Sequence, residues 1–216
     1  MGSALRNYAV PDSVVPKSMY DANSVLVAVS DNDPAAVALS ASSFIGRKAT
    51  GDAGAMTADE ARELMSGAVV QIQHAQTGDV ISGTTAMPLD DTVPQNTEGT
   101  EILTCAITPK KATNILLIIG VVQFSHYTTS VNAVLGLFQD STADALAAAS
   151  GCSAYGGTVK PLIHKMVAGT TNETTFKLRG GLESTGTVYI NTKTGGTSRC
   201  LGGLHATTLT IIEMNP

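Results

Sequence analysis

The residues that could do chemistry are few and stand apart along the chain. The four histidines are His74, His126, His164 and His205. Each stands alone, without an HExxH pattern or a close histidine partner, and we interpret all four as structural residues. "GCSAYGG" (151–157) approaches the GxSxG nucleophile elbow, but Tyr155 replaces the second glycine. The elbow also needs a strand-to-helix turn, which the surrounding residues do not predict, so Ser153 is not expected to be a nucleophile.

The sequence also offers few residues that could bind a metal ion or carry out redox chemistry. Asp90 and Asp91 could bind Ca²⁺ or form a paired-carboxylate site, but they lie between two prolines, where a solvated loop is the simpler interpretation. The cysteines at 105, 152 and 200 are far apart, odd in number and without a CxxC pattern, so we expect free or buried thiols. The sequence therefore predicts no metal, no cofactor and no enzyme, and a glycan depolymerase in particular lacks an acid pair.

Two loops are candidates for surface recognition because each carries a tyrosine. They are "SHYTTS" (125–130) and "CSAYGG" (152–157), and both are also explained as simple turns. Tryptophan is absent and aromatic residues make up 4% of the chain, so a platform for stacking sugars is poorly supplied. The residues predicted for recognition are His126, Tyr127, Thr128 and Tyr155.

The overall composition indicates a β protein without a nucleic-acid or membrane partner. Charged residues are 14% of the chain, against roughly 25% in an average domain, so Thr, Ser, Asn and Gly must supply most of the polar surface. A net charge of −5 with 13 scattered Lys and Arg residues does not suit a phosphate backbone. The most apolar run, residues 115–122, is far shorter than a membrane span.

The first 68 residues predict an arm and a small stem. Residues 1–21 hold two prolines and no clear period, which is typical of an extended arm. Residues 22–68 give two alternating apolar runs and then a helix over 58–65, which begins with a Thr57–Glu60 capping box. So little apolar material cannot bury a core, and we expect this zone to pack on copies of itself or on a partner.

Residues 69–216 predict an antiparallel β-sandwich or jelly roll, because short strand patterns recur with Gly, Thr and Asn turns between them. The stretch 131–150 is ambiguous, since its Ala-rich second half favours a helix by intrinsic propensity. Among so many strands a lone helix would be an orphan, so we predict a hairpin of 131–139 with 144–149. Asp140 and Asp144 are expected to cap its turn.

Two of the predicted strands are apolar on both faces, namely residues 115–122 and 131–138. An ordinary strand of an antiparallel sandwich alternates, with one face in water. Either these strands are covered on both sides within one subunit, or their outer faces meet another subunit. We favour the second interpretation, because a domain of this size has room for two sheets but not for a third layer.

Several blocks of the sequence resemble the C-terminal knob domain of bacteriophage and prophage tail-fibre-like proteins. They are "MPLDDTVPQNTEGTEILTCAITPKKATNILLI", "LFQDSTADALAA", "MVAGTTNETTFKLRGG" and "LGGLHATTLTIIEM". Upstream, "FIGRKATGDAGAMTADEARELM" is similar to the linker that precedes such knobs. The resemblance implies a trimeric β-sandwich knob over 69–216 in a virion structural protein that is assembled in the bacterial cytoplasm.

The implied function is a short homotrimeric fibre or spike, on tail or head, whose knob adheres to the host. Its partners would be its own copies, another virion protein bound through the arm 1–21, and a host surface glycan or protein. The alternative is a capsid decoration protein that stabilises the head. The fold class expected from all these observations is mainly β, with an extended arm, short β segments and one short helix.

Overall fold

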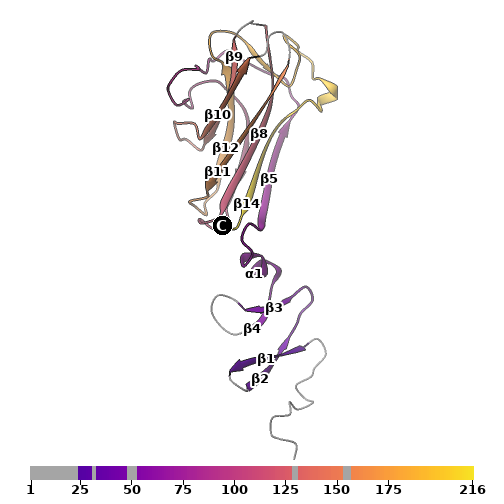
Figure 1. The fold of residues 1–216 in the computed structure, drawn as a ribbon. Helices are drawn as coiled ribbons and strands as arrows, with labels where there is room; N and C mark the ends of the chain where they lie inside the picture. Colours follow the sequence, from indigo (N-terminus) through magenta and orange to yellow (C-terminus); the bar gives the residue numbers. More distant parts are fainter. Residues whose placement is uncertain (1–23, 31–32, 48–52, 128–130, 153–156) are drawn as a thin grey trace, which may run out of the picture. The chain divides into compact units, whose positions relative to one another are not determined.

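The computed structural model describes residues 24–30, 33–47, 53–127, 131–152 and 157–216. The chain divides into two compact units, Met1–Ser66 and Gly67–Pro216, and each is described here by itself (Figure 1). The predicted arm over 1–21 lies outside the described residues. No helix among the described residues is both long enough and apolar enough to cross a membrane.

The N-terminal unit contains two hairpins and one helix. Its elements are β1 (Ser24–Ser30), β2 (Asp33–Ala38), β3 (Phe44–Arg47), β4 (Ala53–Met56) and α1 (Ala58–Glu63). β1 pairs with β2 and β3 with β4, both antiparallel. The capping box is confirmed, because Glu60 N donates to Thr57 Oγ1 (3.2 Å) and Thr57 N donates to the Glu60 carboxylate (2.9 Å). The helix ends at Glu63 rather than at the predicted 65, since Leu64 is already its C-cap.

This unit buries little apolar surface. Val27 and Met56 are its only buried hydrophobic residues among those described, whereas Phe44 is 53% exposed and Met65 55%. Burying a side chain of this size contributes roughly 1.5–3 kcal/mol, so two residues supply only a small core. The described residues therefore form only a small core, and packing of this zone on copies of itself or on a partner stays a prediction.

The C-terminal unit is an antiparallel β-sandwich, and the mainly β prediction is confirmed. Its strands are β5 (Val69–Thr77), β6 (Ile81–Gly83), β7 (Thr100–Ile107), β8 (Ile115–His126), β9 (Asn132–Gln139), β10 (Ala147–Cys152), β11 (Thr158–Val167), β12 (Thr174–Leu182), β13 (Val188–Ile190) and β14 (Thr207–Met214). One sheet has the order β10-β9-β12-β7. The other has six strands, in the order β5-β14-β8-β13-β6 with β11 on the free side of β8.

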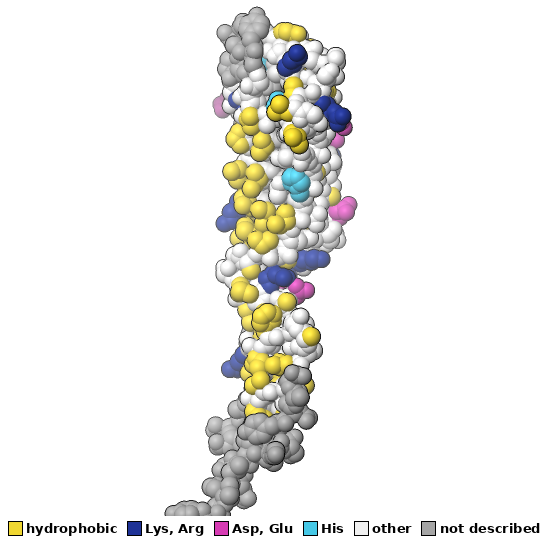
Figure 2. Space-filling model, turned by 90° about the vertical axis from the view of Figure 1, so that its right-hand side faces the viewer, with side chains coloured by type: hydrophobic (Ala, Val, Ile, Leu, Met, Phe, Trp, Pro, Cys, Tyr) yellow, Lys and Arg dark blue, Asp and Glu magenta, His cyan; other side chains and the backbone are white. Residues whose placement is uncertain are grey.

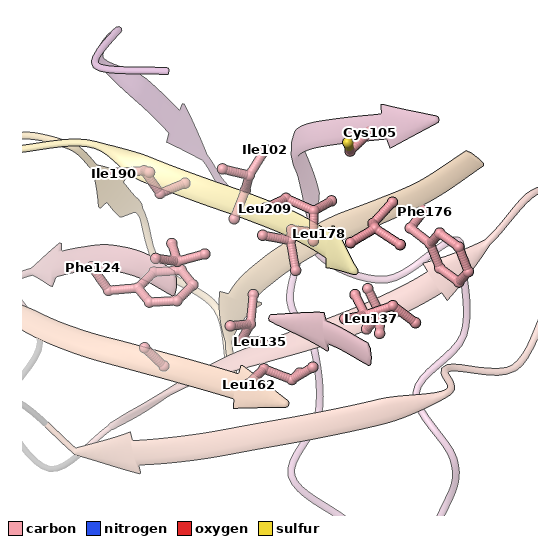
Figure 3. Packing of buried hydrophobic residues seen from close by; sticks show 14 of the residues in the cluster. Ile102, Cys105, Phe124, Leu135, Leu137, Leu162, Phe176, Leu178, Ile190 and Leu209 are labelled. Atoms are coloured by element: carbon pink, nitrogen blue, oxygen red, sulfur yellow. The ribbon is translucent and has the colours of Figure 1, made fainter. Parts of the chain in front are cut away.

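The core lies between the inner faces of these two sheets (Figure 3). Leu178 and Phe176 of β12 and Leu137 of β9 are fully buried and face the six-stranded sheet. Gly120 of β8 leaves room for this packing, because a Cβ there would lie 2.8 Å from Leu178 Cδ2. The inner face of β8 is thus buried within one subunit, as its apolar pattern predicts.

The ambiguous stretch 131–150 is a hairpin, as predicted, with Ala147 of β10 paired to Leu137 of β9. The two aspartates of its turn, which were expected to cap it, bind other segments of the chain. The Asp140 carboxylate accepts hydrogen bonds from Thr174 Oγ1 (2.8 Å) and Thr175 N (2.7 Å), so it ties the turn to β12. Asp144 accepts from Gln95 Nε2 (2.9 Å). Both carboxylates therefore join separate segments of the chain.

Residues 84–99 form a strap over the outer face of the four-stranded sheet. Met87 of this strap is fully buried against Val134 and Phe138 of β9. Its backbone N donates to Leu182 O (2.8 Å). Gly181 permits this close approach, since a Cβ there would lie 2.4 Å from Thr85 O. The outer face of β9 is consequently covered by its own chain.

Further hydrogen bonds hold the end of the strap in place. Arg179 of β12 donates from Nε to Glu98 O and from a terminal nitrogen to Gly99 O, both at 2.9 Å. Asn96 N donates to Ala143 O (2.7 Å) in the hairpin turn. The interpretation that both doubly apolar strands meet another subunit is therefore wrong for β9, because the chain itself supplies a covering segment.

Candidate functional site

The outer face of the six-stranded sheet is the most distinctive surface of the C-terminal unit. Along β8 the burial alternates from Ile115 to Phe124, so that every second side chain faces the core and the others are half-buried. Strand register aligns the outward residues of β11, β8, β14 and β5 in rows. We call the following residues the outer face: Val159, Pro161, Ile163, Lys165, Val167; Ile115, Leu117, Ile119, Val121, Gln123; Thr208, Thr210, Ile212, Met214; and Ile72, His74, Gln76.

The outer face is apolar and nearly uncharged. Ile163 is 65% exposed, Val167 57% and Ile72 56%. Lys165 is its only formally charged residue among those described. Figure 2 shows hydrophobic side chains in a long column over the C-terminal unit. A contiguous exposed apolar patch of this kind is typical of an interaction site.

Apart from Lys165, the polar members of the outer face gather toward one end of the strands. His74 Nδ1 lies 2.8 Å from Thr210 Oγ1 on the neighbouring strand. His205, just before β14, places Nε2 3.0 Å from Gln123 Oε1. At the opposite end, where β14 finishes, the paired residues Met214, Ile115 and Val167 are all apolar. Both histidines have hydrogen-bond partners, in agreement with a structural role.

The candidates for catalysis do not form a reactive centre in the described residues. The Asp90 carboxylate accepts hydrogen bonds from Thr92 Oγ1 (2.5 Å) and Thr92 N (2.9 Å), and these bonds lower the pKa of Asp90. Such a self-contained turn is a structural feature of a loop. The described residues bring no three His, Cys, Asp or Glu side chains together in a way that could hold a metal ion. Ser153 lies outside the described residues.

Two shallow hollows lie beside this loop and the edge strand β10. Asp90, Thr92 and Pro94 of the loop and Ala148 of β10 line both hollows. They are open to solvent and lined mainly by small side chains. Neither hollow holds a buried polar group that would orient a ligand.

The residues predicted for recognition are dispersed. His126 is fully buried at the end of β8, where Phe124 and Ser125 are buried as well, so its prediction as a surface residue is wrong. Tyr127 is 56% exposed, and its ring lies edge-on to Tyr189 with the centroids 6.0 Å apart. Thr128 and Tyr155 lie outside the described residues. The loop tyrosine at 127 is thus the only one of the four that the structure places at the surface.

The thiols agree with the expectation of unpaired cysteines where they are described. Cys105 is buried and Cys200 half-buried, and both are free. Burial raises the pKa of the Cys105 thiol, which disfavours the reactive thiolate.

Sequence reasoning found β8 but missed two other apolar features. In the outward row of β11, Pro161 and Lys165 stand between Val159, Ile163 and Val167 and interrupt the apolar alternation. The second feature is a pair of leucines, Leu201 and Leu204, which are 78% and 84% exposed. They carry no periodic signal, because they stand in a turn.

Comparison with known proteins assigns the family. The Pgp3 C-terminal domain family matches residues 87–216. The chain belongs to this family. A C-terminal knob-like β domain is therefore established, while the more specific resemblance to phage fibre knobs is not. No curated protein matches the chain.

Similar solved structures are distant. The sugar-binding protein EclA, in its C-terminal domain, is 16% identical, with 51% of this chain and 72% of that chain covered and a TM-score of 0.31. The infectious bursal disease virus Gt strain structure is 15% identical, with 80% and 42% covered and a TM-score of 0.36. Latent PorU from Porphyromonas gingivalis is 6% identical, with 70% and 14% covered and a TM-score of 0.33. Likenesses at this level carry no argument about function.

Proposed function

We propose that the protein is a homotrimeric structural protein whose C-terminal knob is held together through the outer face. The observation that carries this proposal is the uncovered apolar surface of β8 and its neighbours, which contrasts with the strapped surface of β9. Removing exposed apolar surface from water contributes roughly 25 cal/mol of favourable free energy per Å². Copies of one chain are the usual occupants of such a surface.

The stoichiometry of three and the biological setting rest on the resemblance to tail-fibre knobs. In this setting the protein is a short appendage of a bacteriophage particle that is assembled in the bacterial cytoplasm. Residues 1–21 bind another virion protein, and the knob adheres to a glycan or protein of the host surface. The N-terminal unit supports association as well, because its described residues bury so little apolar surface. The role is assembly and adhesion, without catalysis.

The association is tested with the full chain by light scattering after gel filtration. We expect a mass three times that of the 22.1 kDa chain. Ile163→Asp puts a charge into the outer face at a site that is 65% exposed, so it should leave the fold intact and produce monomers. Leu89→Asp is the matched control, since Leu89 is 51% exposed but lies in the strap. A wild-type chain that runs as a monomer at all concentrations would refute the proposal.

The biological setting needs a separate test. Purified particles of the producing phage should contain the protein, and particles without it should lose adsorption to the host. Normal adsorption combined with fragile heads would select the decoration role. Absence of the protein from all particles would exclude both.

A further inference from the structure

The two most exposed large hydrophobic residues of the described chain stand together on one turn. The 3-10 helix η2 (Leu201–Gly203) precedes β14, and Leu204 follows it directly. Leu204 is 84% exposed and Leu201 78%. Because the two leucines are neighbours, they form a small exposed apolar site whose burial against a further surface would be favourable.

The turn is fixed in position by its backbone. Leu201, Gly202 and Gly203 have φ values of +49°, +66° and +96°. Two short bonds close it, from Gly203 N to Cys200 O (2.9 Å) and from Leu204 N to Leu201 O (3.2 Å). It rests on Gly78, where a Cβ would lie 2.3 Å from Gly203 O. A left-handed leucine is unfavourable and persists only where the surroundings enforce it, so the backbone of Leu201 is held in place by the turn.

The turn and strand β11 lie at opposite margins of the six-stranded sheet. The turn packs beside Gly78, which immediately follows β5. β11 pairs only with β8, on the side away from β14 and β5. Figure 1 shows the turn in yellow and β11 on opposite sides of the unit. Pro161 inside β11 fits an open edge, because proline has no N–H to donate to a further strand.

The β11 margin presents apolar side chains at the same level as the turn. His205, next to Leu204, contacts Gln123 at 3.0 Å. Gln123 pairs across the sheet with Val159 of β11, which is 53% exposed. A rotation about an axis that runs along the strands preserves this level. Such a rotation can bring the turn of one copy level with Val159 of the next copy, and Ile163 follows on the same face of β11, paired with Ile119.

We propose that Leu201 and Leu204 of each copy pack onto Val159 and Ile163 of the neighbouring copy, so that the copies close into a ring. We call this contact the clasp. This inference rests on the proposed homo-oligomer and specifies its contact. Different patches from opposite margins meet head to tail, so the ring closes without a two-fold axis between subunits. A second copy is favoured over a receptor because the turn is continuous with the margin of the apolar outer face and matches the exposed row of β11.

The contact is tested by cross-linking in the full chain, with Cys152 and Cys200 changed to Ser to remove background. The variant Leu204→Cys with Val159→Cys, treated with a short bismaleimide, should give covalent species up to the closed ring on denaturing gels. The matched control is Leu204→Cys with Leu89→Cys, in which the second thiol is equally exposed but lies in the strap. That control should remain unlinked.

The outcomes separate the inference from the proposed function. An oligomer in scattering without the Leu204→Cys to Val159→Cys link overturns the clasp but leaves the oligomer standing. A covalent dimer formed by Leu204→Cys alone indicates two-fold pairing and also overturns it. A monomeric chain overturns both.

A second measurement does not depend on cross-linking. Leu201→Ala with Leu204→Ala removes only exposed side chains, so the subunit should fold as before. The oligomer should dissociate at a protein concentration at least about tenfold higher than the wild type. Unchanged dissociation combined with tighter or weaker binding of host cells would assign the leucines to a receptor and overturn the clasp.

Discussion

Strands β8 and β9 have nearly the same apolar pattern and opposite surroundings. Each turns one face to the core, with Ile118 on β8 and Leu137 on β9 fully buried. The outer face of β9 lies under the strap 84–99, where Phe138 is also fully buried. The outer face of β8 is left half-exposed by its own subunit. A doubly apolar pattern therefore does not by itself reveal whether the chain covers both faces of the strand, as it does for β9, or leaves one face half-exposed, as it does for β8.

The difference comes mainly from the segments that lie beside each strand and from the space that glycines leave for them. The strap can lie flat because Gly181 and Gly136 leave space above β12 and β9. Arg179 then holds its end by two hydrogen bonds to backbone carbonyls. The neighbours of β8 in the large sheet instead continue its apolar surface outward, to Ile163 on one side and Ile72 on the other. The cover of β9 is supplied by the strap of its own chain, whereas the outer face of β8 stays half-exposed in the single chain.

The largest effect is expected from removing the phenyl ring of Phe138, which is buried beneath the strap. Phe138→Ala should lower the free energy of unfolding by about 3–5 kcal/mol, through lost burial and the cavity that remains. Urea unfolding followed by circular dichroism measures this loss, which should be the same at low and high protein concentration. Leu89→Ala, in the exposed part of the strap, is the control and should change little. A loss below about 1 kcal/mol would show that the strap does not seal β9.

A smaller effect is expected from lifting the strap itself. In Gly181→Ala the new Cβ would lie 2.4 Å from Thr85 O and 3.2 Å from Met87 N, so the backbone of the strap must move. We expect a loss of about 1–3 kcal/mol and faster hydrogen exchange of amides in residues 84–99. Gly54→Ala is the control, because nothing lies within 4 Å of its Cβ position. Unchanged exchange in the strap would contradict the close packing.

A matched pair of substitutions compares the two strands directly. Val134→Thr on β9 and Ile119→Thr on β8 each put a hydroxyl on an outer face, at a cost of about 1–3 kcal/mol where that face is buried. For β9 the loss should appear in unfolding at every concentration. For β8 it should appear as easier dissociation of the oligomer, measured by scattering over a dilution series. Equal behaviour of the two variants would remove the distinction between the strands.

The sequence predicted most of the fold because the strands of the sandwich carry strong local signals. The helix after Thr57 and the Ala-rich return strand β10 followed from capping and from the all-strand context. The strap could not be predicted, since residues 84–99 show no period and act through contacts with segments far along the chain.

The candidate site was predicted in part, for a similar physical reason. The apolar pattern of 115–122 identified the central strand of the outer face, but the exposed leucines at 201 and 204 stand in an irregular turn. Their accessibility depends on backbone angles that local residue types do not specify. His126 was wrongly predicted as a surface residue because β8 extends to it, and the last three residues of this strand are all buried.

The smallest effect is expected from the hydrogen bonds between Glu183 and Asn132, at the start of β9. The described outer face contains no such carboxylate. The Glu183 carboxylate accepts hydrogen bonds from Asn132 Nδ2 and from Asn132 N, both at 2.9 Å, and these bonds lower the pKa of Glu183. Because the folded-state pKa lies below the unfolded one, the bonds stabilise the fold above the unfolded pKa. This stabilisation is lost as the pH falls through the folded-state pKa.

The pH dependence of unfolding tests these hydrogen bonds. Between about pH 5 and pH 3, the wild type should lose slightly more stability than Glu183→Gln, whose side chain does not titrate. The comparison uses urea midpoints at fixed protein concentration, so that other carboxylates cancel. The dissociation of the oligomer should show no difference between the two proteins, because the described outer face contains no carboxylate. A difference in dissociation would mean that the β9 end of the small sheet also takes part in the contact between copies.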